Sequence, residues 1–160
     1  MEERTVRTIL VPVDGSACSE RAIEEAVKLA QKSGPLDIHL LNVQPRIFVE
    51  ETLVYLDAAK MDTYYYGQGS KGLASAEKLL KKAGIAYTAH RAVGPVAETI
   101  VTKAKELGAD GILMGTHGHG RVAGMLLGSV SNKVLHLSPV PVTFVRGEPP
   151  VDFTGRLTAT

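Results

Sequence analysis

Two kinds of hydrophobic pattern alternate along the chain. Short runs of apolar, often β-branched residues, such as 8–13 and 38–43, stop at polar or turn-forming residues and are typical of buried strands. The stretches between them repeat apolar residues every three or four positions, which is the spacing of one helix face. The pattern predicts five strands, over residues 8–13, 38–43, 86–93, 111–115 and 140–145.

Four helices are predicted between the strands, and glycine or proline marks most of their ends. In the first helix, Ala22, Ile23 and Ala26 lie on one face while Glu24 and Glu25 lie on the other, so one side faces the core. Glycine is the common stop after a helix, and proline suits a first helical turn. The helices are expected between Ser16 and Gly34, over 70–83, from Pro95 to Leu107, and over 128–137.

Strands that alternate with helices of this length predict one α/β domain, with a mostly parallel sheet covered by helices on both faces. Pro141 has no N–H for a ladder hydrogen bond, which places the fifth strand at an edge of the sheet. We assign the domain to residues 1–147 and a polar tail to 148–160. The segment 44–69, with tyrosines at 64–66, does not follow the alternation and is expected to combine part of a helix with a loop.

Composition and charge exclude several classes of function. With 44% apolar and 22% charged residues, the 160-residue chain has the balance of an ordinary globular protein. A formal net charge of +1 gives no field that would attract nucleic acid. Neither a signal peptide nor a membrane span fits the N-terminus, and a single cysteine, Cys18, excludes an internal disulfide. We therefore expect a cytoplasmic protein without nucleic-acid or membrane partners.

The residues with the most informative chemistry follow the predicted strands directly. Asp14-Gly15-Ser16 comes after the first strand, Val43 ends the second, Gly94-Pro95 follows the third, and residues 115–120 follow the fourth. Ligands of open parallel sheets bind at the carboxyl ends of the strands, near the point where the strand order reverses. The convergence of these segments predicts a binding site there.

The glycine-rich loop after the fourth strand is a candidate phosphate site. Gly115 and Gly118 are followed by Gly128-Ser129 at the start of the last predicted helix. Glycines let backbone N–H groups approach an anion, and a helix N-terminus offers unpaired N–H donors, to which Ser129 and Ser131 add hydroxyls. Glycines that only turn the chain, with Ser129 as a plain N-cap, explain the same pattern equally well.

Three blocks of the sequence resemble the universal stress protein (UspA-like) family. They are Val11-Pro12-Val13-Asp14-Gly15-Ser16 with the following Ser19 and Ala22, Gly94-Pro95 with Ile100, and the run from Ala109 to Gly118. The spacing of Gly115, Gly118 and Gly128-Ser129 is similar to the ATP-binding pattern of the family, G-x2-G-x9-G-[S/T]. The resemblance covers about residues 6 to 146. It implies a three-layer Rossmann-like fold with five strands in the order 3-2-1-4-5.

The resemblance also implies a ligand, which is ATP or a related adenine nucleotide together with Mg²⁺. Asp14 would lie near the ribose or a phosphate-bound Mg²⁺, and Val43 would meet the adenine through its backbone. The residues alone leave a second interpretation of Asp14 open, since an aspartate before Gly-Ser also braces a turn. The full set implied for the ATP site is Pro12, Val13, Asp14, Val43, Met114, Gly115, His117, Gly118, His119, Gly128, Ser129, Val130 and Ser131.

The family further implies a homodimer and favours a regulatory role. The edge at Val142–Val145 would pair with its two-fold mate, in agreement with the edge position of the fifth strand. We expect a nucleotide-dependent stress-response switch or sensor with little or no hydrolysis. Arg121 and Lys133 are cations near the loop, but nothing except Asp14 marks a catalytic base. A slow ATPase or small-substrate transferase, and a nucleotide-free interaction module, are the alternatives.

Other nucleotide and metal sites fit the sequence poorly. The Walker A pattern G-x-x-x-x-G-K-[S/T] is absent, as is G-x-G-x-x-G after the first strand, and the turn there only faintly echoes an ATP pyrophosphatase loop. His117 and His119 lack a placed carboxylate or cysteine for a metal site. Cys18 lacks a paired histidine or cysteine, which favours a small helix residue over a reactive thiol.

Overall fold

The computed structural model describes residues 6–46, 58–119 and 126–147. The polar tail expected at 148–160 lies outside the described residues. Strands and helices alternate along the chain as β1 Arg7–Pro12, α1 Ala17–Ser33, β2 Leu36–Gln44, α2 Ala58–Lys82, β3 Tyr87–Val93, α3 Val96–Leu107, β4 Gly111–Gly115, α4 Ser129–Leu137 and β5 Val142–Val145.

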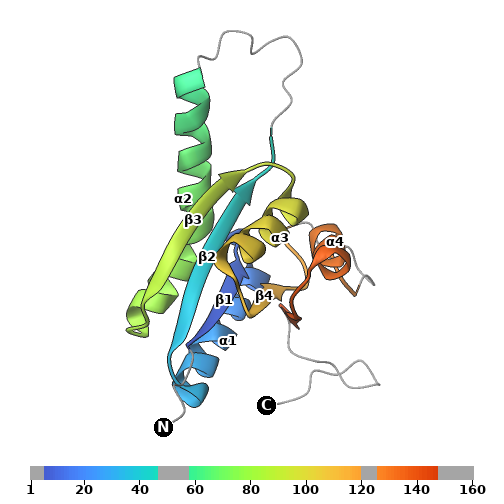
Figure 1. Cartoon of the computed structure of the whole chain (residues 1–160). Coiled ribbons are helices and arrows are strands. Elements are labelled where there is room, and N and C mark those ends of the chain that lie inside the picture. Colours follow the sequence, from blue (N-terminus) through green and yellow to red (C-terminus); the bar gives the residue numbers. More distant parts are fainter. Residues whose placement is uncertain (1–5, 47–57, 120–125, 148–160) are drawn as a thin grey trace, which may run out of the picture.

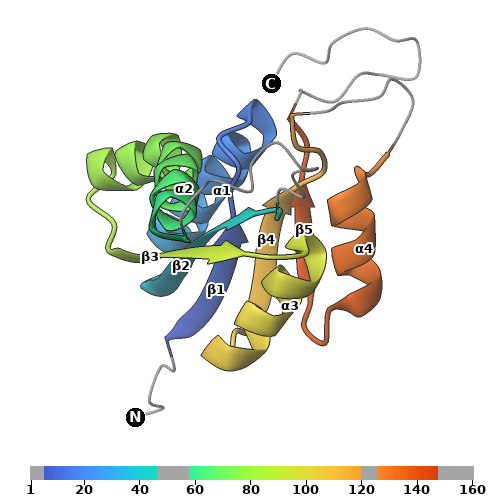
Figure 2. The same ribbon diagram turned by 90° about the horizontal axis from the view of Figure 1, so that it is seen from above.

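The five strands form one sheet in the order β3-β2-β1-β4-β5 (Figure 1). All neighbouring pairs are parallel, with Val11 beside Leu40 between β1 and β2 and Met114 beside Phe144 between β4 and β5. Helices α1 and α2 cover one face of the sheet, and α3 and α4 cover the other (Figure 2). The predicted α/β class, its three layers and its strand order are confirmed, and the sheet expected to be mostly parallel is parallel throughout.

Apolar side chains fill both interfaces between the sheet and its helices. On the side of α1 and α2, Ile23 and Leu73 pack with Leu40 in one core cluster. On the opposite side, Leu41 packs with Ile100 in another. Each large aliphatic side chain that is fully buried contributes about 1.5–3 kcal/mol. The two clusters hold the central strands in place, and thereby the loops that follow those strands.

Helix α2 is longer than the predicted stretch 70–83. It begins at Ala58, and its first turns stand clear of the sheet (Figure 1). Gly67 and Gly69 lower the helix propensity of this part, and most residues before them are exposed, so no apolar face marks it in the sequence. The expected partial helix within 44–69 is thus the start of α2, while residues 47–57 lie outside the described ranges. Neither α2 nor any other helix of the described residues is long and apolar enough to cross a membrane.

Strand β5 begins at Val142, two residues later than the predicted start at 140. Pro141 has no N–H to donate, and its carbonyl accepts a hydrogen bond from the Ile112 N–H at 2.9 Å. The strand has β4 as its single neighbour in the sheet. The predicted edge position is therefore confirmed.

A hydrogen-bonded chain of Asp37, His39 and His90 joins β2 to β3. The Nε2 of His39 is 3.1 Å from the Oδ2 of Asp37, and its Nδ1 is 2.8 Å from the Nε2 of His90. Both contacts are satisfied with neutral rings, because His39 then donates to Asp37 and accepts from His90. Burial lowers the pKa of His90, the charges of His39 and Lys103 lower it further, and Glu106 opposes this shift.

We expect the protein to lose stability as the pH falls through the titration range of His90. The unfolded chain protonates this ring around its ordinary pKa of 6.5, whereas the folded protein does so only at lower pH. The neutral ring therefore makes its full contribution to the free energy of unfolding above pH 6.5, and this contribution is lost as the pH falls through the lowered pKa of the folded state. Since the ring is partly solvated, we expect the loss in the free energy of unfolding to be no more than about 0.5 kcal/mol. The free energy of unfolding, measured by urea denaturation above and below this pH range, should depend less on pH in His90→Asn than in the wild type. An equal pH dependence in the two proteins would contradict the role of His90.

Candidate functional site

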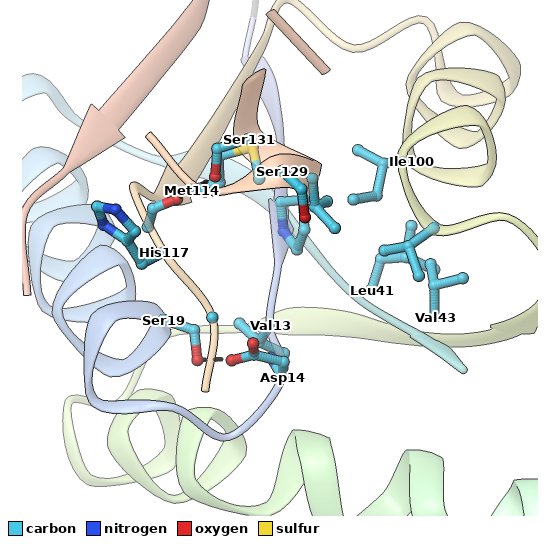
Figure 3. A pocket seen from close by; sticks show the side chains of 16 residues that line it. Val13, Asp14, Ser19, Leu41, Val43, Ile100, Met114, His117, Ser129 and Ser131 are labelled. Carbon is cyan, nitrogen blue, oxygen red and sulfur yellow. Dashed lines mark hydrogen bonds between the residues drawn. The ribbon is translucent and has the colours of Figure 1, made fainter. Parts of the chain in front are cut away.

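A pocket of about 290 Å³ opens at the carboxyl ends of β1 and β4 (Figure 3). From β1 the chain crosses to β2 on one side, and from β4 it crosses to β5 on the other, so the loops diverge and leave a crevice between them. The residues that line it are Pro12, Val13, Asp14, Ser19, Leu41, Val43, Val96, Ile100, Met114, Gly115, His117, Gly118, Gly128, Ser129, Val130 and Ser131.

The structure brings together every residue of the predicted ATP site except His119. The Nε2 of His119 lies 2.8 Å from the carbonyl oxygen of Asp14, so this ring contacts the turn beside the pocket without lining it. Sequence reasoning did not include four lining residues in the site, because three of them follow the apolar periodicity of core residues and the fourth is a serine in the first turn of α1. They are Ser19, Leu41, Val96 and Ile100.

Asp14 both braces its turn and faces the opposite loop. Its Oδ1 accepts a hydrogen bond from the Ser16 N–H at 2.9 Å, and its own N–H lies 3.4 Å from the Ser19 hydroxyl oxygen. Its Oδ2 lies so close to Gly118 that a Cβ on that glycine would be 2.6 Å away. The turn-bracing interpretation of Asp14 thus describes one carboxylate oxygen and leaves the other directed towards the loop after β4.

Local packing accounts for two of the glycines in that loop. A Cβ on Gly115 would lie 2.9 Å from the backbone carbon of Cys18, so β4 ends directly against α1. Gly118 is needed for the approach of Asp14. The Gly128 N–H donates to the Thr116 carbonyl at 2.7 Å, which brings the start of α4 back to the end of β4. The glycines therefore serve the fold and, at the same time, open the space between the two loops.

The N-terminus of α4 has no side-chain cap. Its N-cap residue is Gly128, which offers no side-chain acceptor, and the Ser131 hydroxyl donates instead to the Gly115 carbonyl at 2.9 Å. The first N–H groups of an α-helix have no partner within the helix and carry partial positive charge. Because Ser129, Val130 and Ser131 line the pocket, this end of the helix supplies donors for an anion.

The pocket has an apolar end and a polar end (Figure 3). Leu41, Val43 and Ile100 gather at one end, from β2 and α3, and Val96 adds to this lining. Ser19 and His117 lie at the other end, with Asp14 and Ser129 between the two (Figure 3). The space can therefore take an elongated molecule with one apolar and one polar part.

His117 holds a buried nitrogen without a hydrogen bond. Its Nδ1 lies 3.1 Å from the Thr116 hydroxyl oxygen. Its Nε2 is buried and has no hydrogen-bond partner among the described residues. A buried polar atom without a partner is costly, and this nitrogen is the one such side-chain atom among the described residues. Within the described ranges, no group of three or more His, Cys, Asp or Glu side chains is arranged to hold a metal ion.

The described part of the pocket carries little charge. Asp14 is the one carboxylate that lines it, and no lysine or arginine among the described residues does so. Lys133, a cation expected near the loop, forms an ion pair with Glu98 that ties α4 to α3. The hydrogen bond from Lys133 lowers the pKa of Glu98. Arg121, the other expected cation, lies outside the described residues.

Cys18 is buried beneath the end of β4. Its Sγ lies 3.5 Å from the Thr116 hydroxyl oxygen and donates to the Val145 carbonyl at 3.3 Å. This packing is that of a small helix residue, as the sequence favours.

The family of the chain follows from its match to a known family model. Residues 5–146 match the model of the Universal stress protein family. The chain belongs to the universal stress protein family. It is 34% identical over 145 residues to the universal stress protein YxiE of Bacillus subtilis, a match that spans 86% of this chain and 97% of YxiE. It is 29% identical to the universal stress protein Slr1230 of Synechocystis sp., where the match spans 89% of this chain but 44% of Slr1230.

Solved structures of related proteins share the fold of this universal stress protein. The structure of MJ0577 superposes with a TM-score of 0.76 at 25% identity, over 90% of this chain and 98% of the other. A universal stress protein solved in complex with cAMP superposes with a TM-score of 0.66 at 26% identity, over 89% of this chain and 98% of the other.

Proposed function

We propose that this universal stress protein is a cytoplasmic protein that binds ATP, or a related adenine nucleotide, in the pocket between β1 and β4. Binding would make it a nucleotide-dependent switch or sensor with little or no hydrolysis. The observation that carries the proposal is the uncapped N-terminus of α4, which lies in the same pocket as an apolar end able to take a base.

The apolar end supports recognition of an adenine ring. Leu41 and Ile100 are almost fully buried, and Val43 is partly buried, so these side chains form an apolar wall of the pocket beside the backbone of β2. Small-molecule sites combine such apolar walls with a few placed polar groups. Backbone groups next to Val43 would supply the polar contacts to the adenine edge.

The polar end supports recognition of phosphates. The N–H groups at the start of α4 and the backbone at Gly115 and Gly118 can approach phosphate oxygens without a Cβ in the way. The His117 ring lines the same end of the pocket, while its unpartnered Nε2 is buried. The cAMP complex of a related universal stress protein supports an adenine nucleotide as the ligand class.

Asp14 fits a role beside Mg²⁺. A carboxylate next to a polyphosphate repels it, and the described lining holds no lysine or arginine to offset that repulsion. Mg²⁺ typically takes one or two carboxylates together with substrate phosphates and waters, so a single aspartate suffices. The ion would neutralise phosphate charge and orient the polyphosphate.

The lack of catalytic groups in the described lining favours binding over turnover. Phosphoryl transfer needs a group that orients the nucleophile and cations that stabilise developing charge. Asp14 is the one carboxylate there, and Lys133 is paired with Glu98. The slow ATPase or transferase and the nucleotide-free module are therefore the alternatives that the experiment must separate.

The test is to denature freshly purified protein and identify released small molecules by mass spectrometry, followed by calorimetric titration with ATP, ADP, AMP, cAMP and GTP. We expect the wild type to release stoichiometric adenine nucleotide and to bind adenine nucleotides in preference to GTP. The Gly118→Val, Ser129→Ala variant should neither release nor bind adenine nucleotide. Sustained phosphate release that Asp14→Ala abolishes would favour an ATPase. No released nucleotide and no binding of MgATP would leave a nucleotide-free interaction module.

We also propose a homodimer that pairs through β5. The carbonyl oxygens of Pro141 and Val145 accept hydrogen bonds from Ile112 of β4 and from Thr116 directly after it. Backbone groups of a strand point alternately to its two sides, so those of Val142 and Phe144 point to the open edge of the sheet. Such an unpaired edge is a ready template for a second strand.

A lysine at the exposed Thr143 should convert the dimer to a monomer, because it places like charges opposite each other across the two-fold axis. The matched control is Thr88→Lys on β3, an exposed threonine on the opposite edge of the sheet. Light scattering during gel filtration should find the wild type and Thr88→Lys as dimers and Thr143→Lys as a monomer. A dimer that Thr143→Lys leaves intact would place the interface elsewhere.

A further inference from the structure

Asn42 is a buried polar side chain to which the proposed nucleotide contacts assign no role. It is 2% exposed and precedes Val43 on β2. Its Nδ2 donates to the Val13 carbonyl at 2.8 Å, and its Oδ1 accepts from the Gln44 Nε2 at 2.7 Å. A buried amide is stable only with its hydrogen bonds formed, so these contacts hold it in one orientation.

Val13 is fixed through both of its backbone groups. Its N–H donates to the Leu41 carbonyl at 2.9 Å, and its carbonyl accepts from Asn42. The same peptide unit carries the N–H of Asp14, which lines the pocket. Because a peptide unit is planar, a change at the Val13 carbonyl also turns the N–H of Asp14 and moves the start of the turn.

Helix α2 confines Asn42 from the other side through a bare glycine. A Cβ on Gly72 would lie 2.2 Å from the Nδ2 of Asn42 and 2.9 Å from its Cγ. Gly15, in the left-handed region with φ +80°, also lies against Gly72, since a Cβ on Gly15 would be 3.7 Å from the Gly72 Cα. The backbone of α2 at Gly72 therefore lies against both Asn42 and the turn that holds Asp14.

We propose that Asn42, confined by Gly72, is a positioning residue that sets the Val13–Asp14 backbone and thereby the nucleotide affinity of the pocket. The inference rests on the proposed nucleotide binding and adds residues outside the pocket lining. Asn42 acts through the peptide between Val13 and Asp14. Gly72 acts through Asn42.

Calorimetric titration with MgATP compares Asn42→Ala and Gly72→Ala with a matched control in the same helix. The control is Gly67→Ala, where a Cβ would meet nothing within 4 Å. Both test variants should bind MgATP about tenfold more weakly, the equivalent of one hydrogen bond. Gly67→Ala should bind like the wild type and be more stable to urea, because alanine favours a helix. If Asn42→Ala folds poorly, Asn42→Leu keeps a similar side-chain volume and removes the donor without adding a charge.

A double variant separates positioning from a general loss of packing. Gly72→Ala should add little loss of affinity in the Asn42→Ala protein, because the amide that it displaces is gone. The NMR amide signals of Asp14 and Gly15 should shift in nucleotide-free Asn42→Ala. Unchanged affinity of both single variants, with the wild type binding MgATP, would overturn this inference and leave the proposed function standing. A wild type that binds no MgATP would overturn both.

Discussion

Replacing Gly118 with alanine is expected to weaken the binding of MgATP about a hundredfold. The added Cβ would lie 2.6 Å from the Oδ2 of Asp14. The carboxylate is not free to turn away, because its Oδ1 accepts from the Ser16 N–H at 2.9 Å. Either Asp14 or the loop after β4 must shift, and the pocket lies between the two. Calorimetric titration of wild type and variant measures the loss.

A double variant tests the cause of that loss. Asp14→Ala removes the group that the new Cβ would meet, so Gly118→Ala should cause little further loss of MgATP affinity in the Asp14→Ala protein. Gly118 is exposed, and we expect Gly118→Ala to change the free energy of unfolding, measured with urea, by less than about 1 kcal/mol. If Gly118→Ala lowers the affinity by the same factor with and without the Asp14 carboxylate, the steric explanation is wrong.

The fold could be predicted because the apolar pattern and the turn residues agree along most of the chain. The run 9–13 is apolar without interruption, as expected for a central strand, and β1 occupies Arg7–Pro12. Pro141 marked the edge strand for a local reason, its missing N–H. The start of α2 lacked such agreement, because Gly67 and Gly69 oppose a helix that continues through them.

The polar end of the pocket was easier to predict than the apolar end. Glycines and serines that directly follow strands are unusual enough to be noticed in a sequence. Leu41 and Ile100 lack such a signal, because both are almost fully buried and obey the same periodicity as core residues. Only the strand order and the crossing of α3 show that they face a pocket.

The loop glycines show why one sequence pattern supported two interpretations. Gly115 is required by the contact with Cys18, and Gly118 by the approach of Asp14. Each has a sufficient structural reason, yet both line the same pocket as the uncapped start of α4. Backbone geometry and ligand recognition therefore use the same residues. For this reason a substitution must be compared in backgrounds that separate the two.

The role of Asp14 is best decided by the dependence of ATP affinity on Mg²⁺. The described lining of the pocket offers no cation against the polyphosphate, and an unscreened carboxylate about 4 Å from a phosphate costs on the order of 4 kcal/mol near a protein surface. We therefore expect removal of Mg²⁺ by EDTA to weaken ATP binding by the wild type about a hundredfold.

Asp14→Asn should abolish most of this dependence. Asparagine keeps an oxygen that accepts from the Ser16 N–H and so preserves the turn, but it removes the charge that Mg²⁺ offsets and a ligand that Mg²⁺ prefers. ATP should then bind with similar affinity in MgCl₂ and in EDTA, as measured by calorimetric titration. A carboxylate that contacts the ribose gives a different result, because Asp14→Asn would weaken binding equally under both conditions. Equal weakening would therefore reject the metal role and assign Asp14 to the sugar.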